Sequence, residues 1–217
     1  NGGNVRYFIV PNDSYGDMSI EEIRTGSLTD VAGSDAAIIS TTNNAIDIVC
    51  FVTGAMIETP DGAVPVQDIR QNDLVLTRDN GAQPIRAILT QDVDLNLAPD
   101  RLKPIVFEVG SLGLNRPNRR LNLSPQHRVL VANSAGALVL VPAKALLGHR
   151  GVRIMRGKQQ VTYFHLVLSR HEIIWANGTP TESFYPGPMA LRALSRDHLQ
   201  KVRAIYGQTM LDAEFKS

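Results

Sequence analysis

Short apolar runs separated by turn residues dominate the chain from residue 50 to about residue 184. The runs are rich in β-branched residues, and Gly, Pro, Asn and Asp recur between them at close spacing. Pro60-Asp61-Gly62 is a hairpin signal between 56–59 and 63–66, and Arg78-Asp79-Asn80-Gly81 is another between 74–77 and 84–88. The later strands are expected at 104–109, 127–131, 138–141, 161–168 and 172–176. The pattern predicts an all-β domain over residues 50–184.

Two segments carry helical signals. Residues 142–147 begin with proline and are followed by Gly148, which predicts a short internal helix. In the C-terminal extension, residues 185–217, apolar side chains recur at helical spacing and end before a glycine. These residues are Leu191, Leu194, Leu199, Val202 and Ile205, before Gly207. We expect this amphipathic helix to pack on the β domain, with binding to a partner as the alternative.

Residues 1–49 differ in character from the rest. Their apolar runs, at 5–10, 36–40 and 46–49, are short and lie among many Asn, Asp, Ser, Thr and Gly residues. Such a segment makes a weak core by itself. It is therefore predicted to be a flanking segment attached to another part of a protein.

Charge and hydropathy exclude some classes of function. Lys and Arg number 22 against 21 Asp and Glu, so the balance predicts neither a nucleic-acid binder nor a membrane-surface protein. The local basic cluster at 116–120 is interpreted as a solvated turn, with a binding role as the alternative. No apolar stretch approaches the roughly 20 residues of a membrane span.

The chain contains a single cysteine, Cys50, which cannot form a disulfide within the chain. It is either an inert buried side chain or a nucleophile with a histidine partner supplied by the fold. A candidate partner follows much later, in Ser124-Pro125-Gln126-His127.

Four blocks in order carry a resemblance to a known family. They are residues 50–62, residues 66–77, the Ser124–His127 block and residues 161–184. Together they resemble the Hint (Hedgehog/intein) domain, in its bacterial intein-like branch, over about residues 50–184. The resemblance implies a compact, horseshoe-like β fold and, for the whole protein, a secreted or cell-surface location.

The resemblance also implies a reaction at the Val49–Cys50 bond. A Cys50 thiolate can attack the carbonyl of Val49 in an N-to-S acyl shift, which turns the peptide bond into a thioester. Water or another small nucleophile then takes the acyl group, so the cis substrate is the chain's own N-terminal segment. The expected activity is a single-turnover, autocatalytic cleavage that needs no cofactor and no metal.

Roles follow for the polar residues of these blocks. His127 is expected to protonate the departing Cys50 amine, and Ser124 to hydrogen-bond the scissile peptide or orient His127. His165 is expected to be an auxiliary acid or base. His171 is interpreted as structural, although alternation along a continuous strand would put it on the same face as His165. Two histidines without further ligands disfavour a zinc site. Solvated roles are expected for His149, in a turn, and His198, on a helix.

The chain departs from splicing inteins downstream. Ala176-Asn177-Gly178 is present, but Glu182-Ser183 stands where those proteins have His-Asn, so C-terminal cleavage and splicing are expected to be disabled. Asn72 replaces a usual glycine, which a left-handed turn tolerates. Two other hypotheses remain open. One is a catalytically silent structural or interaction module of a larger exported protein, and the other is a trans-acting cysteine hydrolase.

Overall fold

The computed structural model describes residues 50–96, 98, 100–187, 190–191 and 194–207. The chain divides into two units, Asn1–Ile39 and Ser40–Ser217, and all described residues belong to the second. The apolar runs at 5–10, 36–40 and 46–49 lie outside the described residues, as does Val49 of the expected scissile bond.

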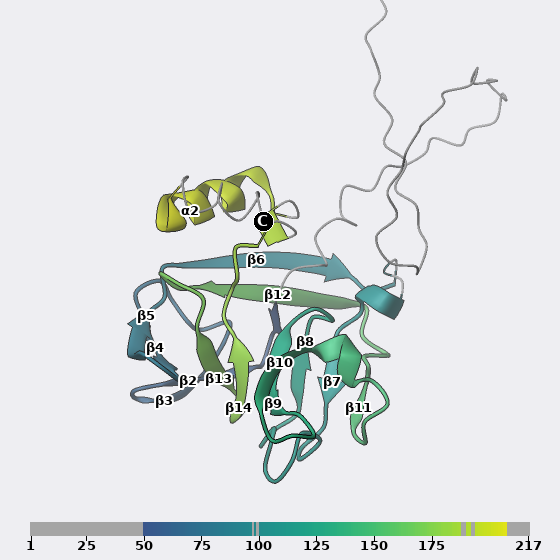
Figure 1. The fold of residues 1–217 in the computed structure, drawn as a ribbon. Coiled ribbons are helices and arrows are strands. Elements are labelled where there is room, and N and C mark those ends of the chain that lie inside the picture. The colour runs from purple at the N-terminus through teal and green to yellow at the C-terminus, as the bar shows by residue number, and fades with distance from the viewer. Residues whose placement is uncertain (1–49, 97, 99, 188–189, 192–193, 208–217) are drawn as a thin grey trace, which may run out of the picture. The chain divides into compact units, whose positions relative to one another are not determined.

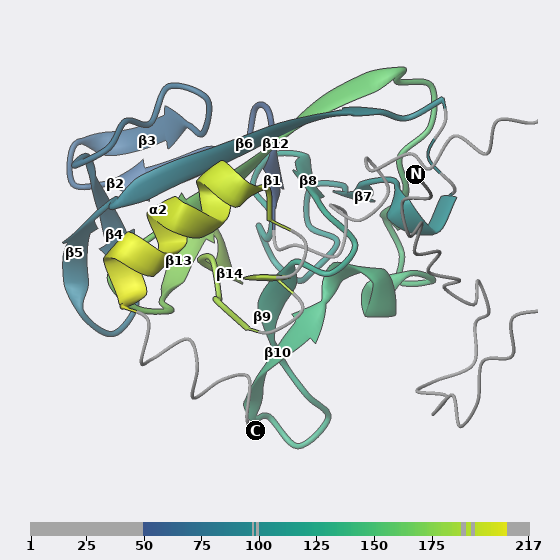
Figure 2. The same ribbon diagram turned by 90° about the horizontal axis from the view of Figure 1, so that it is seen from above.

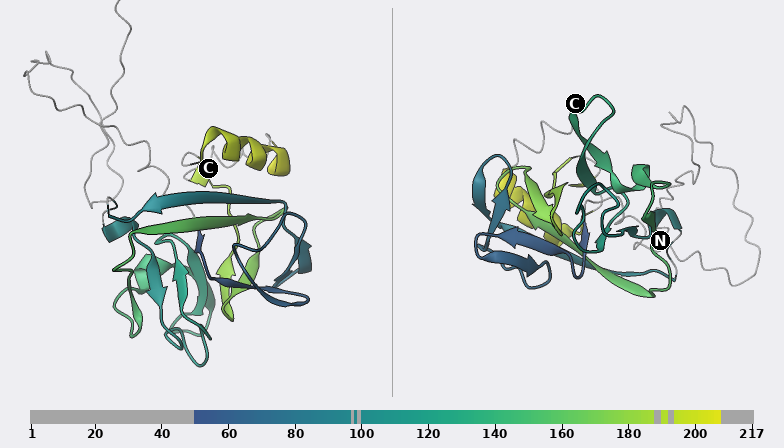
Figure 3. Two further views of the ribbon diagram at one scale, coloured as in Figure 1. Left: turned by 180° about the vertical axis from the view of Figure 1, so that it is seen from behind. Right: turned by 90° about the horizontal axis from the view of Figure 1, so that it is seen from below.

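Within the described residues, the strands form two antiparallel sheets (Figure 1). The first is six-stranded, in the order β11-β7-β8-β1-β12-β6. Its longest pair, β6 with β12, keeps one register over eight residue pairs, from Gln160 opposite Asp94 to Val167 opposite Ala87, and is also clear from behind in Figure 3. The bounds are β1 Phe51–Val52, β6 Ala87–Asp94, β7 Ile105–Phe107, β8 Leu121–Leu123, β11 Val152–Ile154 and β12 Gln160–Val167.

The second sheet has the order β10-β9-β14-β13-β2-β3, with β4 pairing with both β13 and β5. Its bounds are β2 Met56–Thr59, β3 Gly62–Pro65, β4 Leu74–Thr77, β5 Gly81–Pro84, β9 Arg128–Ala132, β10 Leu138–Pro142, β13 Ile173–Ala176 and β14 Thr179–Glu182. The prediction of a mostly β fold is confirmed.

The two hairpin signals had different outcomes. The first is confirmed: β2 pairs with β3, and Gly62 takes the positive φ of 112° that its place requires. The second is correct in place but wrong in its partner strand. β4 pairs with β5, which begins at Gly81, and the predicted strand at 84–88 is divided between the end of β5 and the start of β6. Sequence reasoning missed β1, β8, β11 and β14, because runs of two to four residues carry little periodicity.

The described residues contain fewer helices than strands. Residues expected to form a short helix form the 3₁₀ turn η3, Ala143–Leu146, and η2 spans Asp100–Leu102. An amphipathic helix is confirmed as α2, Arg196–Tyr206, but it begins after Leu191 and Leu194, which the predicted stripe had included. The Ser195 side chain accepts a hydrogen bond from the His198 N–H at its start, and Gly207, with a φ of 78°, ends it. No helix in the described part of the chain has the length and apolar character of a membrane span.

The buried residues form two hydrophobic clusters, and β12 supplies both. Alternate side chains of a strand point to opposite faces. Tyr163 and Val167 therefore join the cluster that contains Cys50, while Phe164 and Leu166 join the other. Helix α2 lies along β6 and adds Val202 to the Cys50 cluster (Figure 2).

Candidate active site

Cys50 directly precedes β1, the strand between β8 and β12 in the first sheet. Phe51 is opposite Leu123 on one side and opposite Phe164 on the other. In antiparallel pairs, one step back on β1 is one step forward on each neighbour. Cys50 is thereby brought beside Ser124 and His165.

Ser124 contacts the backbone of Cys50 twice. Its Oγ accepts a hydrogen bond from the Cys50 N–H at 2.9 Å, and its own N–H donates to the Cys50 carbonyl at 3.0 Å. Both residues are buried. The amide nitrogen of the Val49–Cys50 bond is thus held by the Ser124 side chain, in the contact expected of a residue that hydrogen-bonds this peptide.

His165 contacts the thiol. Its Nε2 lies 3.3 Å from Cys50 Sγ, and the Cys50 side chain is only 1% exposed. Burial raises the pKa of the Cys50 thiol well above its ordinary value, and the Ser124 hydroxyl opposes this by stabilising the thiolate. Since the thiol is protonated at neutral pH, a base is needed to activate it, and His165 is at the distance to act as one.

His127 approaches Cys50 from the other hydrophobic cluster. A turn closed by the His127 N–H and the Ser124 carbonyl, 3.1 Å apart, returns the chain after Pro125. The His127 ring packs edge-on against Phe51, with centroids 4.4 Å apart. This turn explains the Ser-x-x-His spacing, because it places the first and fourth residues side by side.

The environment of the His127 ring disfavours its charge. Burial lowers its pKa to about 3, His165 and His171 add to this effect, and the nearby Cys50 backbone opposes it. The Cys50 backbone lies close enough to favour the protonated ring. In the described residues, however, neither ring nitrogen of His127 has a partner in hydrogen-bond geometry. His127 is therefore neutral at pH 7. The expectation from sequence was an imidazole that exchanges its proton near neutral pH.

His171 is not on the strand of His165, so the alternation that would put both histidines on one face of a continuous strand does not apply. β12 ends at Val167, and His171 lies in the connection to β13. Its Nε2 is 3.2 Å from Glu182 Oε2, and its ring packs edge-on against Tyr185. The residue after Glu182, Ser183, is buried and accepts a hydrogen bond from the Glu172 N–H at 2.9 Å.

Two buried residues near the site were not predicted to be functional, although Glu182 is among the departures from splicing inteins. Tyr163 lies two positions before His165 in β12, on the same face, and its hydroxyl has no hydrogen-bond partner in the described part of the chain. Glu182 is completely buried beside the start of β9. Strand alternation from His165 would have found Tyr163, whereas Glu182 carried no local signal.

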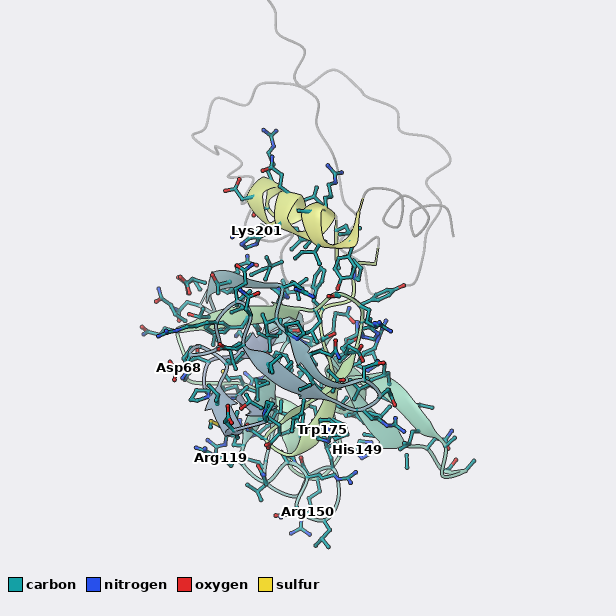
Figure 4. The ribbon with its side chains drawn as sticks, turned by 90° about the vertical axis from the view of Figure 1, so that its left-hand side faces the viewer. Asp68, Arg119, His149, Arg150, Trp175 and Lys201 are labelled. Atoms are coloured by element: carbon teal, nitrogen blue, oxygen red, sulfur yellow. The ribbon has the colours of Figure 1, made fainter. Side chains whose placement is uncertain are left out.

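The remaining histidines lie elsewhere. His149 is exposed in the turn after η3, and Figure 4 shows it at the end of the domain away from α2, near Arg150. His198 is half-buried on α2, so its expected solvated role holds only in part. Arg116, Arg119 and Arg120 are exposed near the buried Pro117, as expected of a turn at the surface.

The β fold and the cysteine at its first strand match a protein family. The family model described as "Hint domain" matches residues 49–188, and the chain belongs to this family. The match begins one residue before Cys50 and ends before α2. No curated protein matches the chain in sequence.

Several solved structures are similar to the chain at low identity. The gp41-1 intein is 12% identical, with a TM-score of 0.37, over 61% of this chain and 97% of its own. The bacterial intein-like domain from Clostridium thermocellum is 12% identical, with a TM-score of 0.37, over 63% and 98%. The MchDnaB-1 intein is 13% identical, with a TM-score of 0.39, over 61% and 98%.

Proposed function

We propose that this Hint domain cleaves its own chain at the Val49–Cys50 bond. The observation that carries the proposal is the arrangement of Cys50, whose Sγ lies 3.3 Å from His165 Nε2 while its N–H donates to Ser124 Oγ at 2.9 Å. Nucleophile and base are within reach of each other, and the amide of the bond to be broken is held.

In the first step, His165 Nε2 takes the proton from Cys50 Sγ, and the sulfur attacks the carbonyl carbon of Val49. The C–N bond of the tetrahedral intermediate then breaks, the electron pair stays on the Cys50 nitrogen, and a proton completes the amine. His127 is the proposed donor. Because its resting pKa is about 3, it binds a proton from solvent only as negative charge develops on the intermediate, and then passes that proton to the nitrogen. His165 keeps the proton of the thiol until the sulfur leaves in the second step.

In the second step, water or another small nucleophile attacks the thioester. The C–S bond breaks, the acyl segment that ends at Val49 leaves, and the Cys50 thiol is restored. The domain acts once, because its substrate is its own N-terminal segment. The same chemistry supports residues 1–49 as the released flank and residues 50–184 as the catalytic domain.

Splicing is not part of this proposal. By its resemblance to splicing inteins, the chain has Glu182 and Ser183 where those proteins have His-Asn. Neither residue can cyclise as asparagine does. Ser183 is moreover buried and bonded to the Glu172 backbone. We therefore expect no cut after β14.

A catalytically silent module is the second candidate. It is favoured by the burial of Cys50 and by the raised pKa of its thiol, which are the properties of an unreactive cysteine. A trans-acting hydrolase finds less support, because a thiol that is 1% exposed is poorly placed for an external substrate.

Intact mass during incubation with dithiothreitol or hydroxylamine tests the proposal, with Cys50→Ala as the control. Self-cleavage predicts two fragments, one ending at Val49 and one beginning at Cys50, which form faster with either nucleophile and are absent from the control. An unchanged mass under all conditions would refute self-cleavage and leave the silent module.

A further inference from the structure

Glu182 is a fully buried carboxylate that the proposed reaction does not use. A buried carboxylate is costly unless hydrogen bonds and opposite charges compensate it. Its compensation comes from two residues. The Arg128 N–H donates to Oε1 at 2.9 Å, and Oε2 lies 3.2 Å from His171 Nε2 and 3.6 Å from Arg128 Nη1.

These contacts act on the peptide that follows His127. The nitrogen of the His127–Arg128 peptide donates to Glu182, and its carbonyl accepts from the Ala143 N–H at 2.8 Å. The N–H of His127 itself is bonded to the Ser124 carbonyl. The N–H and carbonyl of His127 and the N–H of Arg128 are therefore all bonded, and Glu182 supplies the side-chain partner among these three hydrogen bonds.

The His127 ring depends on this backbone more than most catalytic histidines do. An active-site imidazole is commonly oriented by a hydrogen bond to one of its ring nitrogens. In the described residues neither nitrogen of His127 has such a partner, and the ring packs against Phe51. Its direction toward Cys50 is thus set by the position of its own Cα and by packing.

We propose that Glu182 is a positioning residue for His127. It holds the His127–Arg128 peptide through Oε1 and ties the connection between β12 and β13 to the same carboxylate through His171. The proposal rests on the proposed function for its effect on cleavage, but its structural part does not. Glu182, in β14, would then have a role in cleavage at the Val49–Cys50 bond, although it cannot take part in C-terminal cleavage.

Variants at Glu182 separate its two properties, and Glu172 supplies matched controls. Glu182→Gln keeps an oxygen that can accept the Arg128 N–H and removes the charge, whereas Glu182→Ala removes both. Glu172 is a second buried glutamate of the same sheet region, 4% exposed. It is bonded to Asn80 at 2.8 and 2.9 Å and is close to Arg170, and among the described residues its carboxylate makes no hydrogen bond or ion pair with His127 or Arg128.

The first measurement is the rate of hydroxylamine-induced cleavage. We expect Glu182→Ala to lower it by about tenfold to a hundredfold, the range that displacement of a catalytic group produces, and Glu182→Gln by less than about threefold. Glu172→Ala is expected to lower thermal stability as Glu182→Ala does, with the cleavage rate of the folded protein unchanged.

The second measurement needs no activity. In a Cys50→Ala background, amide hydrogen exchange at Arg128 and the NMR signals of the His127 ring report the backbone and ring directly. Glu182→Ala should speed Arg128 exchange at least about tenfold, the loss of one hydrogen bond, and broaden the ring signals, while Glu172→Ala changes neither.

Either of two results would overturn the proposal: equal effects of the Glu182 and Glu172 variants on Arg128 exchange, or a Gln variant as impaired as the Ala variant in both measurements. If the unsubstituted protein does not cleave at all, the proposed function fails, and the Arg128 and His127 measurements still decide whether Glu182 positions His127.

Discussion

At the scale of single residues, the two histidines near Cys50 approach it from different clusters. His165 meets the sulfur on the face of β12 that carries Tyr163, and His127 lies beside Phe51 on the other side of the sheet. In the proposed reaction, removal of a proton from sulfur and delivery of a proton to nitrogen therefore belong to different groups. A single imidazole would have to turn between the two atoms.

Substitution of His165 tests this division. His165→Ala should lower the rate of thiol-induced cleavage at pH 7 about a hundredfold, because the buried thiol loses its base. The rate should partly recover above pH 9, where hydroxide can remove the proton. His149→Ala, at an exposed histidine, is the matched control. Equal rates for the two variants at pH 7 would show that His165 takes no part.

At the scale of elements, α2 lies outside residues 49–188, which match the Hint family model, and still packs in the hydrophobic cluster that contains Cys50. Val202 is completely buried in the same hydrophobic cluster, and Tyr206 donates a hydrogen bond to the Phe184 carbonyl at 3.5 Å. The Phe184 ring in turn meets the His165 ring edge-on, with centroids 5.9 Å apart. The helix is thus linked by packing to the residue that contacts the thiol.

Truncation of Val202 tests this link. Val202→Ala should cost about 2 kcal/mol of unfolding free energy from lost burial and the cavity that remains, and should speed modification of Cys50 by a maleimide. Lys201→Ala, at the exposed neighbour labelled in Figure 4, should change neither quantity. Urea unfolding and the kinetics of labelling supply both measurements. An unaltered labelling rate in a destabilised Val202→Ala protein would separate α2 from the thiol.

At the scale of the whole molecule, a buried neutral histidine makes global stability depend on pH. The pKa of His127 is about 3 in the folded state, below the 6.5 of an ordinary histidine. Below pH 6.5 the unfolded chain therefore binds a proton that the folded chain does not. The contribution of the neutral His127 to the free energy of unfolding is fully present above pH 6.5 and is lost as the pH falls toward 3.

The loss should approach about 1.4 kcal/mol per pH unit for this one proton. Urea unfolding between pH 8 and pH 4, in the Cys50→Ala background to prevent cleavage, measures it. His127→Gln carries no titrating group at this position, so its stability should fall less steeply over the same range. Parallel curves for the two proteins would mean that folding does not lower the pKa of His127.

Much of the β architecture could be predicted from local sequence. The Pro60-Asp61-Gly62 turn requires a positive φ at its glycine, and Gly62 has one. Asn72, where a glycine is usual, has a φ of 73°, as its side chain allows. Ser195, the apolar stripe and Gly207 define α2 without reference to the rest of the chain. In each case a few neighbouring residues contain the whole physical cause.

For the candidate site, the sequence indicated which residues belong together, and the tertiary structure decided their contacts. The resemblance carried by four ordered blocks indicated Cys50, Ser124, His127 and His165 as a set, and one turn relates Ser124 to His127. Only the tertiary structure decided which atom meets which: β1 lies between β8 and β12, and their registers place Ser124 at the amide and His165 at the sulfur. The pairing of Glu182 with Arg128 and His171, and the low pKa of His127, were also decided there. Both depend on burial among residues far apart in the chain, a property that no local pattern contains.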